Sequence, residues 1–207
     1  MMIFIYNLDS EDKKPLWLLA LCFIFGAINL HYDVDILEFV FTFINTENLF
    51  LKYGGEALSV AITEELLKFI VVILIIYPNK AFDEPFDGIV YSVFVGMGFA
   101  TAENLTFVLQ GNTSIALFRM LSAIPAHFVF AVIMGYYLGI AKSRRKKETL
   151  YISLSILVPI ILHAIYDYFL YLDFVPGLWV GGILTLALSL IFAKNAIMEH
   201  LESSPFK

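Results

Sequence analysis

The stretch Thr63-Glu64-Glu65-Leu66-Leu67-Lys68 places two adjacent carboxylates and one ammonium inside an apolar run, residues 57–77, that is long enough to cross a bilayer. Each charged side chain at the centre of a membrane helix costs roughly 2.5–3.5 kcal/mol on insertion scales. At helical pitch, Lys68 lies four residues after Glu64 and three after Glu65, so we expect it to neutralise one of them but not both. The other carboxylate then requires a partner from another helix, a proton, water or a metal ion.

Composition places this chain in a membrane. Its 207 residues are 60% hydrophobic and have a mean hydropathy of +0.82, whereas a soluble domain is usually about 45–50% apolar. We therefore predict an all-α, polytopic transmembrane helical bundle that forms a single domain over residues 1–207. The single cysteine, Cys22, cannot form an intrachain disulfide. No cleavage pattern of a signal peptide follows the first apolar run, so we expect that run to be retained.

The apolar runs predict about six spans and one additional helix near the N-terminus. The spans are expected at residues 15–30, 56–77, 87–109, 115–141, 149–172 and 175–193. Residues 31–55 mix apolar and polar side chains, a pattern that favours an interfacial or re-entrant helix over a further span. Gly54 and Gly55 are expected to end that helix.

The distribution of basic residues predicts the orientation. Lys and Arg are retained on the cytoplasmic side of membrane proteins, and six spans place both termini and the basic segment 142–147 on one side. Ten of the thirteen Lys and Arg residues then lie in the cytoplasm, Lys52 and Arg119 lie outside, and Lys68 lies within the membrane. We therefore expect a multi-pass protein of the cell membrane with cytoplasmic termini.

Further polar residues interrupt three other spans, namely Glu103, Asn104, His127, His163 and Asp167. Asp167 follows His163 by four residues, so it shares a helical face with the imidazole and can orient it. At roughly 1.5 Å per residue, these groups and the glutamate pair lie about 5–18 Å below the outer surface. We therefore predict one hydrated pocket that opens toward the extracytoplasmic side, with Lys68 and Asn104 in supporting roles.

Carboxylates and imidazoles in a hydrated pocket suit the activation of water. A glutamate or a histidine can take a proton from water while a second group stabilises the developing oxyanion. Alternatively, two histidines and a glutamate can ligate zinc, which lowers the pKa of its bound water, and His127, His163 and Glu103 are the candidate ligands. The sequence lacks H-E-x-x-H, G-x-S-x-G and a Gly-rich phosphate loop. These absences exclude the usual zincin and serine-hydrolase arrangements, and we expect no nucleic-acid partner.

Four sequence blocks, in order, resemble the PrsW family of intramembrane proteases. They are Glu64-Glu65-x-x-Lys68, the segment from Gly96 to Asn104, Arg119 with Pro125-Ala-His127 and Met134-Gly135-Tyr136, and His163-x-x-Tyr166-Asp167. The resemblance covers residues 56–172. This family is distantly related to the CAAX prenyl proteases and the bacteriocin-processing proteases. The resemblance implies a membrane endopeptidase that cuts a membrane-anchored anti-sigma factor on its extracytoplasmic side.

The resemblance also implies roles for individual residues. Glu64 or Glu65 would be the general base and His163 would assist it, while His127 and Glu103 complete the site and Asp167 orients His163. The expected partners are a single-pass membrane protein as substrate and the lipid bilayer. The metal stays open, because the family is classed with metallopeptidases whereas the related prenyl proteases resemble enzymes that use a glutamate–histidine pair. An inactive membrane scaffold that binds a partner helix and a proton-coupled carrier are the alternative functions.

Overall fold

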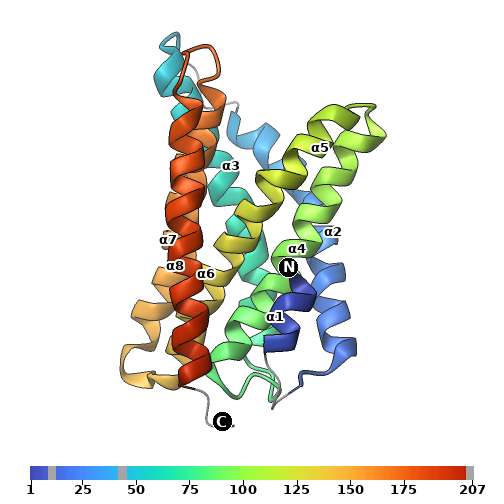
Figure 1. Cartoon of the computed structure of the whole chain (residues 1–207), viewed down its shortest axis with the longest axis vertical. Helices are drawn as coiled ribbons and strands as arrows, with labels where there is room; N and C mark the ends of the chain where they lie inside the picture. Colours follow the sequence, from blue (N-terminus) through green and yellow to red (C-terminus); the bar gives the residue numbers. More distant parts are fainter. Residues whose placement is uncertain (9–12, 42–45, 204–207) are drawn as a thin grey trace.

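The computed structural model describes residues 1–8, 13–41 and 46–203, with the side chains of all of these except 29–41. Among them, regular structure is helical throughout: α1 (Met2–Leu8), α2 (Leu16–Phe41), α3 (Leu49–Val71) with the π-helical turn η1 (Val72–Ile76), α4 (Pro85–Leu109), α5 (Thr113–Leu121), α6 (Ala123–Ser143), the 3₁₀ turn η2 (Arg145–Lys147), α7 (Glu148–Tyr171) and α8 (Trp179–Glu202). Figure 1 shows the long helices alternating in direction, with α5 and α6 descending one after the other. The predicted all-α bundle is confirmed.

Four of the described helical segments are long and apolar enough to cross a membrane. They cover residues 85–109, 123–143, 145–171 and 179–202. Within α2, the residues whose side chains are described include the apolar stretch Leu16–Ile28. Helix α3 is long enough, but Glu64, Glu65 and Lys68 lower its apolar character. The structure therefore supports four of the six predicted spans by length and composition.

The predicted division of residues 15–55 was wrong. Helix α2 continues to Phe41 instead of ending near residue 30, so residues 31–41 belong to the same helix as the first apolar run. Residues 42–45, which formed part of the predicted interfacial helix, lie outside the described residues. Helix α3 begins at Leu49, seven residues before the predicted start, because the Asn48 side chain accepts a hydrogen bond from the Leu51 N–H at 3.2 Å and caps the helix.

Gly54 and Gly55 lie inside α3 and do not end a helix. A Cβ atom at Gly54 would meet the Tyr168 ring at 3.6 Å, an ordinary contact distance. Small residues at such positions let membrane helices approach closely, which offsets their low helix propensity. Helix α3 packs against α7 along this side, and tertiary packing therefore overrides the local signal of the two glycines.

The predicted span 115–141 is two helices. Helix α5 ends at Leu121 and α6 begins at Ala123, and Ser122 between them has the non-helical angles φ −123° and ψ −69°. Pro125 lies in the first turn of α6, where its missing N–H removes no intrahelical hydrogen bond. The last helix is also displaced from its predicted range of 175–193, because α8 extends to Glu202.

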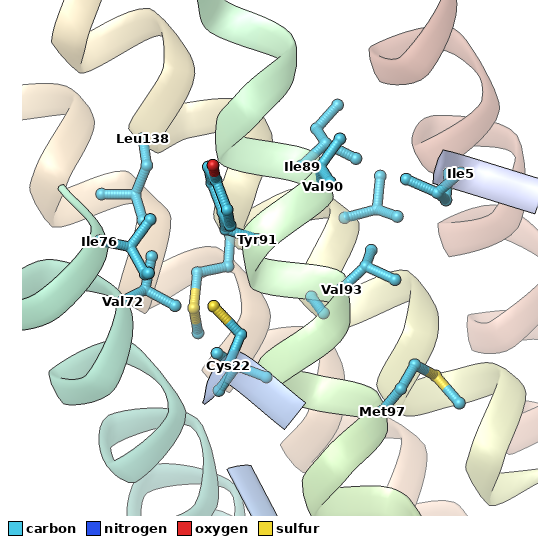
Figure 2. Packing of buried hydrophobic residues seen from close by; sticks show 14 of the residues in the cluster. Ile5, Cys22, Val72, Ile76, Ile89, Val90, Tyr91, Val93, Met97 and Leu138 are labelled. Carbon is cyan, nitrogen blue, oxygen red and sulfur yellow. The ribbon is translucent and has the colours of Figure 1, made fainter. Parts of the chain in front are cut away.

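Helix α4 lies at the centre of the apolar core. It begins with Pro85 in its first turn and with a capping box formed by Glu84 and Asp87. Its neighbours are α2 and α6. Figure 2 shows Tyr91 of α4 directed toward Ile76 and Leu138, while α1 brings Ile5 to the same cluster. All of these apolar side chains are fully buried.

Small residues bring α4 and α6 into backbone contact. A Cβ atom added at Gly135 would lie 2.2 Å from the carbonyl oxygen of Gly88, and one added at Gly96 would lie 2.7 Å from the Cβ of Ala131. On α6, Ala131 and Gly135 follow His127 at intervals of four residues, so all three share one face of the helix. The close packing of α4 and α6 therefore continues up to His127.

Candidate active site

Five helices contribute polar side chains to one cluster inside the bundle. The cluster consists of Glu64, Glu65 and Lys68 from α3, Glu103 from α4, Arg119 from α5, His127 from α6, and His163 and Asp167 from α7. The structure thus brings together the six candidate catalytic residues and Lys68. Asn104 is next to Glu103 in sequence, but its buried Oδ1 has no hydrogen-bond partner among the described residues.

Glu65 occupies the most enclosed position in this cluster and has no exposed surface. Its Oε1 accepts hydrogen bonds from Lys68 Nζ at 2.8 Å and from His163 Nδ1 at 2.9 Å. On the other side of the ring, His163 Nε2 lies 3.2 Å from Asp167 Oδ2. An ionised carboxylate only accepts hydrogen bonds, so a ring between two of them is held as the donor to both. The Phe130 ring stacks on His163 at 4.9 Å and fixes its plane.

Lys68 connects the glutamate pair to the second histidine. Its Nζ also lies 3.4 Å from Glu64 Oε2 and 3.0 Å from His127 Nδ1. The flexible side chain places the ammonium between both carboxylates, and its single positive charge balances only one of the two negative charges. An ammonium only donates, so His127 accepts at Nδ1 and donates from Nε2 to Glu103 Oε2 at 3.0 Å.

Arg119 is a member of the cluster that the sequence analysis placed outside the membrane. Its guanidinium lies 2.5 Å from Glu103 Oε1 and over the Phe107 ring at 4.5 Å from the centroid. It reaches the cluster because the break at Ser122 lets α5 approach α4 separately from α6. The sequence blocks that resemble the PrsW family include Arg119, but no role in the site was predicted for it.

The depth of the cluster differs along the helices. Glu103 lies six residues before the end of α4 and His163 eight residues before the end of α7, so both are roughly 9–12 Å from those helix ends. Glu64 lies fifteen residues after the start of α3, roughly 22 Å along that helix, whereas the sequence predicted a depth of about 5–18 Å. The difference follows from the earlier start of α3 at Leu49.

A cavity of about 250 Å³ lies beside the cluster. Its polar lining includes Glu64, Glu103, Arg119, His127, His163, Tyr166 and Asp167, and its apolar lining includes Val60, Phe107, Ile115, Phe118 and Leu170. Glu64 therefore borders the cavity, whereas Glu65 lies enclosed beside it. Sequence reasoning missed the wall residues, because apolar side chains in apolar helices carry no signal of their own.

The donor atoms of the cluster fit a divalent metal ion. One ligand atom from each of Glu64, Glu65, His127 and His163 lies within 4.8 Å of the others. Two carboxylates and two imidazoles are donors that zinc accepts. In addition, Glu65 Oε2 is buried without a hydrogen-bond partner in the part of the chain that the structure describes. The predicted ligand Glu103 lies outside this group, on the far side of His127, where its hydrogen bond orients the ring.

Comparison with known proteins agrees with this geometry. A family model described as "PrsW family intramembrane metalloprotease" matches residues 14–194. The chain belongs to this PrsW family. A relative named Protease PrsW from Geobacillus kaustophilus is 38% identical over 168 residues, which is 81% of this chain and 73% of the relative.

Two further relatives carry the same name. The Bacillus subtilis protein is 34% identical over 173 residues, which is 81% of this chain and 76% of the relative. The Clostridioides difficile protein is 32% identical over 189 residues, which is 84% of this chain and 75% of the relative. No solved structure matches the chain. PrsW membership identifies the chain as a membrane protease, and the cluster described above is its candidate active site.

Proposed function

We propose that this PrsW-family protease cleaves a membrane-anchored protein substrate with a water molecule that Glu64 activates. The observation that carries the proposal is the different placement of the adjacent glutamates. Glu64 borders the cavity, whereas Glu65 is fully buried and holds Lys68 and His163 through one oxygen. The glutamate beside the cavity can reach a substrate and its water, and the enclosed glutamate organises the groups around it.

The proposed reaction uses groups that already border the cavity. Glu64 takes a proton from the water as the water attacks the carbonyl carbon of the scissile peptide bond, and it then gives this proton to the leaving amine. Arg119 stabilises the oxyanion, because its Nε is buried without a hydrogen-bond partner among the described residues and its side chain borders the cavity. His163, held between Glu65 and Asp167, assists from the cavity wall.

A metal ion would add to this chemistry. The residues that would hold it are Glu64, Glu65, His127 and His163, and zinc is the ion we propose for this donor set. When bound, zinc polarises a carbonyl group and lowers the pKa of a water molecule.

The placement in the membrane follows from charge. The basic segment 142–147 and the 78–84 loop lie at the lower end of the bundle in Figure 1, and the turns at 110–112 and 172–178 lie at the upper end. We assign the lower end to the cytoplasm, since basic residues gather there, and complete six spans with α2 and α3. The cavity residues of α4, α5 and α7 lie toward the upper end. The substrate is therefore cut near the extracytoplasmic side, as expected for a single-pass protein of the anti-sigma-factor type.

The test compares cleavage of a set of single-pass substrates by purified wild type, Glu64→Gln, Glu65→Gln and His163→Ala. Loss of the general base lowers cleavage at least about 100-fold in Glu64→Gln, with the unfolding temperature close to that of wild type. Glu56→Gln on the same helix is the matched control, because Glu56 forms a long ion pair with Lys52, at 3.9 Å. This variant should cleave the substrates at the wild-type rate. Full cleavage by Glu64→Gln would show that the water is activated elsewhere.

A further inference from the structure

Lys68 Nζ lies among the atoms that a metal ion would use. It is within 3.4 Å of Glu64 Oε2, 2.8 Å of Glu65 Oε1 and 3.0 Å of His127 Nδ1. These three residues are three of the four that form the candidate metal-binding group. The side chain of Lys68 is 2% exposed, so water does not separate the ammonium from these donors.

The ammonium of Lys68 and a bound metal ion would compete for the same lone pairs on Glu64, Glu65 and His127. Zinc binds carboxylate oxygen and imidazole nitrogen at about 2.0–2.2 Å, so an ion among these donors would lie within a few ångströms of Nζ. Two positive charges at that separation in a buried site repel strongly. In addition, an imidazole nitrogen has one lone pair, so His127 Nδ1 cannot accept from Lys68 and coordinate a metal at the same time.

We propose that Lys68 is a built-in competitor of the metal, which must leave Glu64, Glu65 and His127 before a divalent ion binds there. The proposal rests on the metal site of the proposed function but does not require that the protein cleave a substrate. Lys68 therefore sets the metal affinity of the site, and in the metal-free protein it prevents the two adjacent carboxylates from repelling each other.

The structure also shows an aromatic contact that the ammonium can keep when it is displaced. Nζ lies 4.3 Å from the centroid of the Phe99 ring, at cation–π distance. Phe99 belongs to α4, across from the glutamate pair. A lysine side chain has four rotatable carbon–carbon bonds, so the ammonium can move away from His127 while keeping its contact with the aromatic face.

The charges of the whole cluster favour the same competition. Four carboxylates, those of Glu64, Glu65, Glu103 and Asp167, face the basic side chains Lys68 and Arg119 and the imidazole of His163, which donates to two of the carboxylates. Replacing Lys68 by a neutral residue removes one positive charge from the cluster and frees three donor atoms from their contact with the ammonium. Both changes increase the attraction of the site for a divalent cation.

The test measures zinc binding to full-length protein in detergent after treatment with a chelator. Zinc is titrated in competition with a fluorescent zinc indicator against wild type, Lys68→Met, Lys68→Arg and Lys52→Met. Lys68→Met should bind one zinc ion per chain at least ten-fold more tightly than wild type. Lys68→Arg keeps the charge and adds donors, so it should bind zinc no more tightly than wild type. Lys52→Met removes an exposed lysine of the same helix and should match wild type.

Thermal unfolding supplies an independent measurement. Metal-free Lys68→Met should unfold at a lower temperature than wild type, and added zinc should raise its unfolding temperature by more than it raises that of wild type. Equal or weaker zinc binding by Lys68→Met, or no zinc binding by any of the four proteins, overturns the competition. If Lys68→Met does not fold, tighter binding by Lys68→Arg than by wild type overturns it.

Cleavage assays on the same samples separate the two proposals. Cleavage by wild type when none of the four proteins binds zinc, with the activity lost in Glu64→Gln, would overturn the competition and leave the protease mechanism standing. Tighter zinc binding by Lys68→Met in samples that cleave no substrate would support the competition and overturn the protease mechanism.

Discussion

Replacing Gly135 by Ala should force α4 and α6 apart and disturb the contact between His127 and Glu103. The new Cβ atom would lie 2.2 Å from the Gly88 carbonyl oxygen and 2.5 Å from its carbonyl carbon, whereas ordinary contacts begin at 3.4 Å. Both clashing atoms belong to the backbone, so no side-chain rotation relieves the overlap. The helices must therefore separate locally by about 1 Å, the shortfall in these distances.

Two magnitudes follow from this separation. Overpacking of a close interface costs about 1–3 kcal/mol, which lowers the unfolding temperature of a chain of this length by about 2–12 °C. His127 lies two helical turns from Gly135, and its Nε2 is 3.0 Å from Glu103 Oε2. A shift approaching 1 Å takes this pair beyond hydrogen-bond distance. Misplacement of active-site groups by about 1 Å can cost about 100-fold in rate, so we expect cleavage to fall about 10- to 100-fold.

The assay pairs thermal unfolding in detergent with the rate of substrate cleavage. Gly54→Ala is the matched control, because its Cβ atom would meet the Tyr168 ring at an ordinary 3.6 Å and Ala favours the helix by about 1 kcal/mol. That variant should unfold at the same or a higher temperature than wild type. The reasoning would be refuted by a Gly135→Ala protein that unfolds within about 1 °C of wild type and cleaves the substrate at the wild-type rate.

The remaining predictions concern Asp167, which contacts His163, and the ion pair of Lys14 with Asp83 at the lower end of the bundle. Asp167→Asn should lower cleavage about 10- to 100-fold, because Asp167 Oδ2 lies 3.2 Å from His163 Nε2 and orients the ring; an unchanged rate would assign the ring's orientation to Glu65 and Phe130. Burial alone would raise the pKa of Asp83, but Lys14 at 3.2 Å lowers it below its ordinary value of 3.8. A lowered carboxyl pKa stabilises the fold at pH values above the unfolded pKa and loses this effect as pH falls through the folded pKa. Between about pH 5 and 3, the unfolding temperature of wild type should therefore fall more steeply than that of Lys14→Met, and parallel curves would contradict this.

Local rules predicted part of the fold well. The apolar runs placed α4 and α7 to within two residues at each end, because Pro85 and the acidic Glu148 mark helix starts that depend on nearby residues alone. The same rules failed at Gly54-Gly55 and at Ser122. Two glycines commonly end a helix in isolation, but here α7 packs against them. Ser122 carries no strong breaking signal, and the chain turns there because α5 packs on α4 and the following helix packs deeper in the bundle.

In the candidate site, too, local spacing predicted some contacts and failed for others. Spacing of three and four residues placed Lys68 near the glutamates and Asp167 near His163, and both contacts are present. Spacing did not link Arg119 to Glu103, because a residue eight positions before His127 would lie about two turns away on one continuous helix. The separate direction of α5 returns it to Glu103 instead.

The sequence by itself determined that this chain is a helical membrane protein with carboxylates and histidines inside the bundle. Hydropathy sets where a chain can remain in lipid, and charges within apolar runs require partners wherever they lie. Only the tertiary structure decided that Glu64 borders the cavity, that Glu65 is enclosed, and that Lys68 reaches His127. Helical periodicity fixes which residues share a face, but the partner across that face depends on helix crossing and register. Here the contact of Gly88 with Gly135 sets that register, through atoms that carry no charge.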